Sequence, residues 1–190
     1  MKRLLPLTLL ALATAAPAAI IQFDLIGTGG PGLLFTNEPS VASGGTGGEI
    51  LGGITFDNVT KLLTVNVGWG TANGFTNLTG NATNANIHGP TATANGNGFT
   101  ETATVMIGLT SGGVTYNNSA SGGSITGTST TVLSAAQENA LMTGRTYLNV
   151  HTAANGGGEM RGFLVVVPEP ASALAGLTVL GAMALRRRRA

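Results

Sequence analysis

The stretch Leu62-Leu63-Thr64-Val65-Asn66-Val67-Gly68-Trp69 repeats with a period of two residues. Its odd-numbered positions are all apolar, whereas Thr64 and Asn66 lie on the other side of the repeat. Successive side chains of a β-strand point to opposite faces, so this pattern predicts a strand with one buried face and one solvated face. We expect Val67 and Trp69 to lie in a hydrophobic core.

Similar short segments recur outward from this stretch, separated by runs rich in glycine and asparagine. Further strands are predicted over residues 22–25, 53–56, 85–88, 103–109, 123–131, 146–152 and 162–167. Short strands at such spacing are typical of an antiparallel sandwich or barrel. We therefore predict one all-β domain over residues 20–167, because about 150 residues can bury a single core.

One short helix is predicted after Ser134. Gln137 follows Ser134 by three residues, as in a capping box, and Gly144 stands where a C-terminal cap is expected. Leu141 and Met142 supply apolar contacts between these two signals. We expect this helix to close one end of the β domain.

The charge of the chain is concentrated at its ends. Six of the nine basic residues lie in the two terminal segments, which leaves an acidic body between residues 20 and 167. The three basic residues of the body are Lys61, Arg145 and Arg161. Such a body lacks the basic patch that dominates affinity for nucleic acid, so no nucleic-acid partner is expected. The absence of cysteine excludes disulfides and thiolate chemistry.

Residues 1–19 have the layout of a secretory signal peptide, and we expect this segment to form an N-terminal signal helix. Lys2 and Arg3 precede an apolar run over residues 4–15, and small residues follow at Ala16-Pro17-Ala18. Cleavage is predicted after Ala18 or Ala19.

The C-terminal segment, residues 168–190, has three parts. A Pro-Glu-Pro motif is followed by the apolar run 171–185 and then by four arginines: Pro168, Glu169, Pro170, Arg186, Arg187, Arg188 and Arg189. Fifteen helical residues rise about 22 Å, short of a hydrocarbon core of about 30 Å, so we predict a weak transmembrane anchor helix with its arginines in the cytoplasm.

This ending resembles the PEP-CTERM sorting signal of Gram-negative bacteria. The resemblance implies processing by an exosortase, a transient stay in the inner membrane, and delivery to the cell surface or the extracellular matrix. A generic tail anchor is the alternative.

Three motifs of the body resemble the CHRD domain, a family named after chordin. They are Asn37-Glu38-Pro39-Ser40, Asn86-Ile87-His88-Gly89-Pro90, and the run from Leu133 through Tyr147-Leu148-Asn149-Val150-His151-Thr152 to Gly158-Glu159-Met160-Arg161-Gly162. The resemblance implies an immunoglobulin-like antiparallel β-sandwich with a distant likeness to superoxide dismutase folds, and it implies no general activity. The family's central motif often has histidine where this chain has Asn86.

Four polar residues form a candidate cluster: His88, His151, Glu159 and Arg161. The period of two places each histidine opposite its apolar neighbours, and places Glu159 and Arg161 on one strand face. In the structural interpretation Arg161 pairs with Glu159 or a backbone carbonyl, and His151 bonds across to the strand of His88. In the alternative, His88, His151 and Glu159 bind a metal.

No catalytic constellation stands out. The glycine run at residues 27–32 is interrupted by Pro31 and no helix pattern follows it, which argues against a nucleotide loop. No serine has the nucleophile-elbow spacing. We therefore expect a non-catalytic, cofactor-free surface or matrix protein that binds an extracellular protein or polysaccharide. The alternative function is a metal-binding or redox-protective domain.

Overall fold

Every strand pairing in the computed structural model is antiparallel, and the structure describes residues 19–168. The predicted signal helix and anchor helix therefore lie outside the described residues, apart from Ala19 and Pro168 at their borders. Within residues 19–168 no helix is long and apolar enough to cross a membrane.

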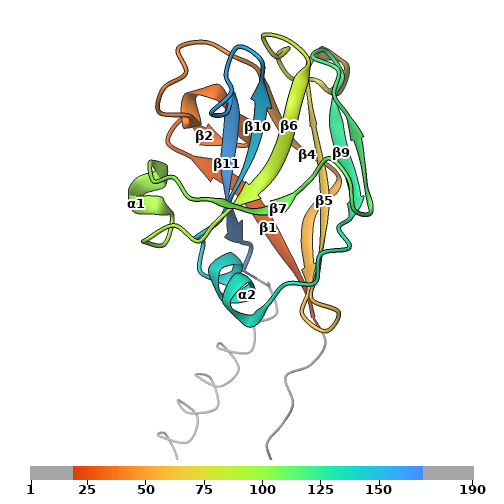
Figure 1. Ribbon diagram of the computed structural model, residues 1–190, viewed down its shortest axis with the longest axis vertical. Helices are drawn as coiled ribbons and strands as arrows, with labels where there is room; N and C mark the ends of the chain where they lie inside the picture. Colours follow the sequence, from red (N-terminus) through yellow and green to blue (C-terminus); the bar gives the residue numbers. More distant parts are fainter. Residues whose placement is uncertain (1–18, 169–190) are drawn as a thin grey trace, which may run out of the picture.

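The described chain forms an 11-stranded sheet whose main path runs β7-β6-β10-β11-β1-β4-β5-β9-β8 (Figure 1). The strands are β1 (Ile20–Gly27), β2 (Gly30–Pro31), β3 (Leu33–Leu34), β4 (Thr46–Asp57), β5 (Leu62–Trp69), β6 (Ala82–His88), β7 (Val105–Gly108), β8 (Val114–Asn117), β9 (Ser124–Thr128), β10 (Tyr147–Thr152) and β11 (Met160–Val166). The all-β class and a sandwich-like arrangement are confirmed. The likeness to immunoglobulin domains stays a prediction.

Strand β1 joins the two halves of the sheet. Its first half pairs with β4 and its second half with β11, and Phe23 has a partner in each, Ile54 and Val166. β3 makes a second junction, because Leu34 pairs with both Arg161 and Thr46. A strand that changes partners along its length makes a corner in a sheet. The halves are thereby folded so that their apolar faces pack against each other.

Strand β4 is interrupted where it passes this corner. Glu49 pairs with Val67 and Ile54 with Val65, so four residues of β4 bulge out opposite a single residue of β5. The bulge places Leu51 at φ 49°, and the Glu49 carboxylate accepts a hydrogen bond of 2.7 Å from the Leu25 N–H of β1. Bulges increase the local twist and bend of a strand, as the corner requires.

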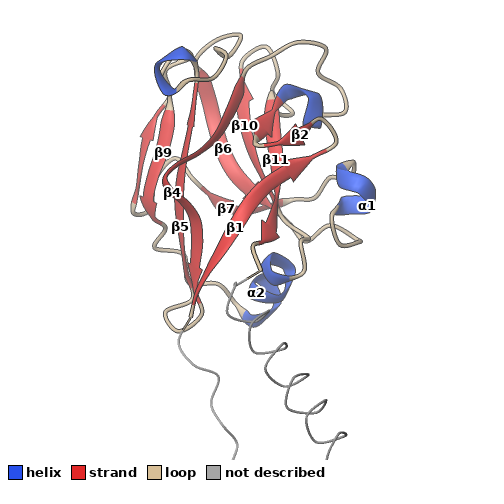
Figure 2. Cartoon of the chain, turned by 180° about the vertical axis from the view of Figure 1, so that it is seen from behind, coloured by secondary structure: helices blue, strands red, loops and turns tan. Residues whose placement is uncertain are grey.

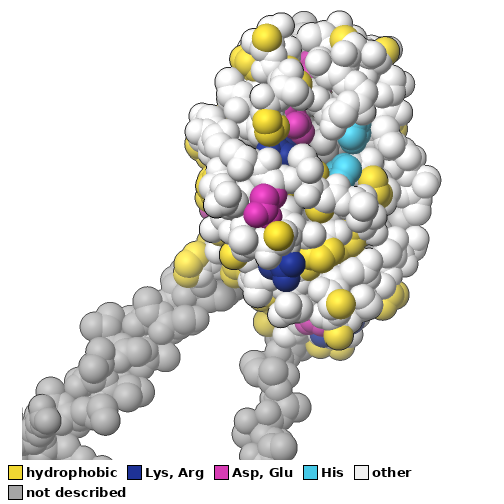
Figure 3. Space-filling view, turned by 60° about the vertical axis from the view of Figure 1, so that its left-hand side comes forward, with side chains coloured by type: hydrophobic (Ala, Val, Ile, Leu, Met, Phe, Trp, Pro, Cys, Tyr) yellow, Lys and Arg dark blue, Asp and Glu magenta, His cyan; other side chains and the backbone are white. Residues whose placement is uncertain are grey.

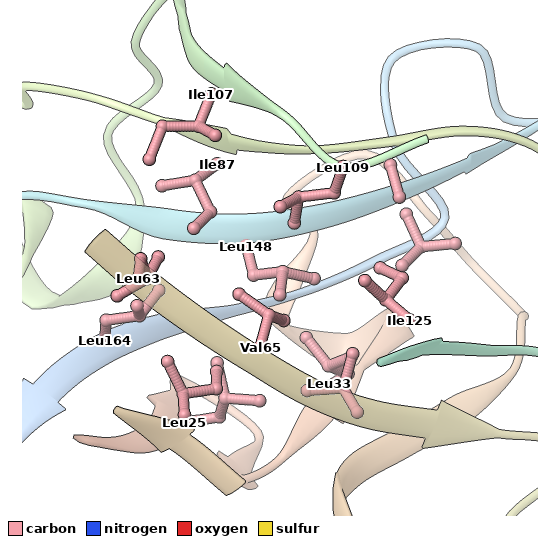
Figure 4. Packing of buried hydrophobic residues seen from close by; sticks show 14 of the residues in the cluster. Leu25, Leu33, Leu63, Val65, Ile87, Ile107, Leu109, Ile125, Leu148 and Leu164 are labelled. Atoms are coloured by element: carbon pink, nitrogen blue, oxygen red, sulfur yellow. The ribbon is translucent and has the colours of Figure 1, made fainter. Parts of the chain in front are cut away.

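The core lies between the two halves of the sheet, where residues from both are interdigitated (Figure 4). Leu63, Val65, Val67 and Trp69 are all fully buried, which confirms the face predicted for β5. The Trp69 ring lies against Gly123, where an added Cβ would come within 2.2 Å of it, and its Nε1–H donates to the Ser119 carbonyl. The position therefore requires glycine because of a close approach.

The predicted helix is present as α2 (Ala135–Met142), which lies at one end of the sheet (Figure 2). Ser134 and Gln137 form the predicted capping box, and Gly144 has a φ of 66°, the left-handed conformation of a C-terminal cap. Lys61 fixes the helix to the β4–β5 turn through an ion pair of 2.8 Å with Glu138. The segment labelled α1 in Figure 1 (Gly96–Phe99) is a single left-handed turn, because all four of its residues have positive φ. It lies beside β11, where Phe99 contacts Phe163, and has no counterpart among the predicted elements.

Candidate functional site

Strands β6, β10 and β11 carry a row of polar side chains on the face opposite the core. Tyr147 of β10 pairs with His88 of β6 and with Phe163 of β11. The next pairs on the same face join Asn149 to Asn86 and to Arg161. Directly opposite residues of an antiparallel pair project to the same side. His151 continues the row on β10, so the three strands present one continuous polar face.

Three loops cover this polar face, and backbone carbonyls from each of them meet its side chains. The segment after β3 supplies the Asn37 carbonyl, the segment before β7 supplies those of Phe99, Glu101 and Ala103, and the β10–β11 loop supplies those of Gly156 and Gly157. The polar row is therefore largely internal, between the sheet and its covering loops.

Arg161 is the most buried member of the row, with none of its surface exposed. Its guanidinium donates to the carbonyls of Asn37 at 2.7 Å, Phe99 at 2.8 Å and Glu101 at 3.2 Å. The same group lies over the ring of Tyr147, with Cζ 5.0 Å from the ring centroid. These contacts join β11 to two loops whose contacting residues are 60 or more positions away in the sequence.

Glu38 is the charged partner of Arg161. Its Oε1 lies 3.8 Å from the arginine Nε, and the carboxylate is 7% exposed. Burial raises the pKa of Glu38 although the Arg161 charge and a hydrogen bond with Asn149 act to lower it. Burial outweighs the ion pair because the Nε–H points at the Asn37 carbonyl instead, so Oε1 accepts no hydrogen bond within the described chain.

The two histidines lie side by side, with ring centroids 5.9 Å apart and a tilt of 43° (Figure 3). The His88 Nδ1 is 2.8 Å from the Ala103 carbonyl, and its ring stacks on Tyr147 at 4.8 Å. The His151 Nδ1 is 3.0 Å from the Gly156 carbonyl, and its Nε2 is 3.2 Å from the Asn86 Oδ1. His151 thus lies within reach of the strand that carries His88, where the structural interpretation expects a hydrogen bond.

Burial lowers the pKa of both imidazoles below the ordinary value of 6.5. For His88 the nearby positive charges of His151 and Arg161 lower the pKa further, against the Ala103 carbonyl, which raises it. Both rings are therefore neutral at pH 7, each with one protonated nitrogen.

Glu159 directly precedes β11 at the β10–β11 hairpin, and its carboxylate is engaged by other loops. One oxygen accepts from the N–H groups of Gly45 and Thr79, and the other from the Thr79 and Thr152 hydroxyls and the Asn155 amide. Burial acts to raise the pKa of Glu159, but the hydrogen bonds from Thr79, Thr152 and Gly45 outweigh it and lower the pKa. The carboxylate ties the loops before β4 and before β6 to the β10–β11 hairpin.

The structure thus brings His88, His151 and Arg161 together on one polar face. The Glu159 carboxylate is hydrogen-bonded instead to the loops before β4 and β6 and to the β10–β11 hairpin. Arg161 uses backbone carbonyls, as one branch of the structural interpretation predicts, and its ion-pair partner is Glu38. Within residues 19–168 no three His, Cys, Asp or Glu side chains gather in a way that suits a metal ion. Glu38 enters the sequence analysis only as part of a motif that resembles the CHRD domain, and its separation of 123 residues from Arg161 hides the pairing.

The comparison with protein-family models identifies these same segments, because the model of the CHRD domain matches residues 34–164. The chain belongs to the CHRD domain family. Searches of curated proteins and of solved structures found no match. The matched region of the CHRD domain includes Glu38, both histidines, Glu159 and Arg161, so the whole polar face lies within it. It leaves out β1, whose pairing with β4 and β11 makes it part of the same fold.

The lowered pKa of the two histidines predicts how stability changes with pH. As the pH falls below about 6.5, the unfolded chain takes up protons that the buried imidazoles resist, so the free energy of unfolding decreases. Urea denaturation in EDTA should give a lower midpoint at pH about 5.5 than at pH about 7.5. The double variant with His88→Gln and His151→Gln should show a smaller difference between the two urea midpoints. If the difference between the midpoints is unchanged in this variant, titratable groups other than the two histidines cause it.

Proposed function

We propose that this protein is an exported, non-catalytic CHRD domain that acts as a structural and binding module at the cell surface or in the extracellular matrix. Membership of the CHRD family supports such a module. The signal-peptide pattern of residues 1–19 and the PEP-CTERM pattern of residues 168–190 support export, exosortase processing and passage through the inner membrane.

One observation carries the structural role: the charged side chains of the closing motif are engaged by the protein itself. Arg161 donates to three backbone carbonyls, and Glu159 accepts five hydrogen bonds from loops and strands. Buried charges held in this way fix loop positions. Such engagement suits a rigid scaffold that presents surfaces.

The surface with the clearest binding character is the outer face of β4, β5, β9 and β8. Cross-strand pairing sets its side chains in rows of hydroxyls and amides: Thr55, Thr64 and Thr128, then Asn66, Thr126 and Thr115, then Ser124 and Asn117. No charged residue stands in these rows. An uncharged array of donors and acceptors matches the hydroxyls of a neutral polysaccharide, so we take a matrix polysaccharide as the partner.

The sorting proposal predicts the effect of removing the C-terminal segment. Deleting residues 168–190 should release the CHRD domain as a soluble secreted protein, because anchor and sorting motif are lost together. Replacing only Arg186–Arg189 with serine should instead impair orientation and processing. Cell fractionation and immunoblotting distinguish these results. A deleted chain that stays in the membrane fraction to the same extent as the full chain would contradict the proposal.

The polysaccharide proposal predicts that charge on the hydroxyl face weakens binding. Thr115→Glu with Thr128→Glu should lower cosedimentation with deproteinised exopolysaccharide from the producing cells, because buried carboxylates lose hydration at the contact. The control pair, Thr102→Glu with Thr104→Glu, adds the same charge outside this face and should bind normally. Wild-type binding should persist in about 0.5 M NaCl, since it uses no ion pairs. Equal binding by both pairs of variants would contradict the proposal.

A further inference from the structure

The two histidines leave lone pairs that the protein does not satisfy. Each Nδ1 lies within hydrogen-bond distance of a backbone carbonyl, which only accepts, so both Nδ1 atoms carry the proton and both Nε2 atoms carry a lone pair. The His88 Nε2 is buried and has no hydrogen-bond partner among residues 19–168. The His151 Nε2 faces the Asn86 Oδ1, which is itself an acceptor, at 3.2 Å.

Two acceptors that face each other gain from a positive centre placed between them. A metal bound at about 2.0 Å by both the His151 Nε2 and the Asn86 Oδ1 would leave these two atoms about 3.2 Å apart at an angle near 105°. When two imidazoles bind one metal through Nε2, the distance between their ring centroids depends on the N–metal–N angle. The centroids are about 4.5 Å apart when this angle is about 90° and about 6.4 Å apart when it is about 180°. The observed separation of the two rings, 5.9 Å, lies within this range.

We propose that His88 and His151 bind a Cu²⁺ ion through their Nε2 atoms, with the Asn86 side-chain oxygen as a third ligand and water completing the coordination. Copper heads the affinity order for nitrogen ligands among divalent metals, and tetragonal nitrogen and oxygen ligation is typical of Cu²⁺. The site goes beyond the structural role proposed above and does not depend on it.

The surroundings of the pair have the features of a metal site. A backbone carbonyl accepts the Nδ1–H of each ring, which is the outer contact that ordinarily fixes a ligating imidazole. The two histidines of the chain also lie together, and part of each is visible at the surface, although the His88 Nε2 itself is buried (Figure 3). Glu159 has no part in this site, because its oxygens already accept five hydrogen bonds.

The test is a copper titration of the full-length chain, purified in detergent and stripped with EDTA. Calorimetry with CuSO₄ at pH about 7.5 should show one Cu²⁺ per chain, and electron paramagnetic resonance should show coupling to two imidazole nitrogens. His88→Gln and His151→Gln should each weaken binding by about tenfold or more. Circular dichroism of the metal-free variants checks that they are folded.

A gain of affinity keeps the test decisive if a histidine variant fails to fold. Asn86→His replaces the amide oxygen with a third imidazole at the same position, and it should tighten copper binding by about tenfold. The matched control, Asn118→His, adds an imidazole at an exposed position just after β8 and should leave the affinity unchanged. The proposal is overturned if the wild-type chain binds no stoichiometric copper, or if Asn86→His has no effect. In that case the Asn86 amide is rotated and donates its N–H to His151.

Discussion

The buried guanidinium of Arg161 is the constraint on which the polar side of this domain depends. A charge removed from water is costly unless hydrogen bonds and an opposite charge replace its hydration. Here the replacement comes from three loop carbonyls, the Tyr147 ring and the carboxylate of Glu38. Because these groups belong to distant segments, satisfying one side chain fixes the loops that follow β3 and precede β7.

Glu159 repeats the same principle two residues earlier in the sequence. Its carboxylate gathers hydrogen bonds from Gly45, Thr79 and Thr152, and so positions the loops before β4 and before β6. A short segment leading into β11 thus organises most of the loops around the polar face. This explains why a CHRD domain of little charge concentrates an acid and a base at this point: the two residues serve as anchors for the backbone. The histidine pair lies between the anchored loops, where a fixed geometry suits a bound ion.

The sequence predicted the elements whose signals are local. The period of two in residues 62–69 placed Trp69 in the core, and the spacing of Ser134 and Gln137 located α2, because each signal depends on neighbouring residues. Pairings set by topology could not be predicted in this way. The contact of Glu38 with Arg161 exists because β3 joins β11 beside Leu34, and the hydrogen bonds of Glu159 exist because two distant loops meet at the β10–β11 hairpin. Period alone grouped Glu159 with the histidines, and it contains no information about which loop approaches the strand end.

Hydrogen exchange of Arg161→Met and Arg161→Lys tests the central claim most directly. Methionine retains much of the side-chain volume but donates no hydrogen bond, whereas lysine keeps the charge without the three-way geometry of the guanidinium. If Arg161 holds the loops, exchange should accelerate in residues 35–41 and 95–103 in both variants, more in the methionine variant, while β5 stays protected. Unchanged protection of both loops in a folded Arg161→Met chain would contradict the account.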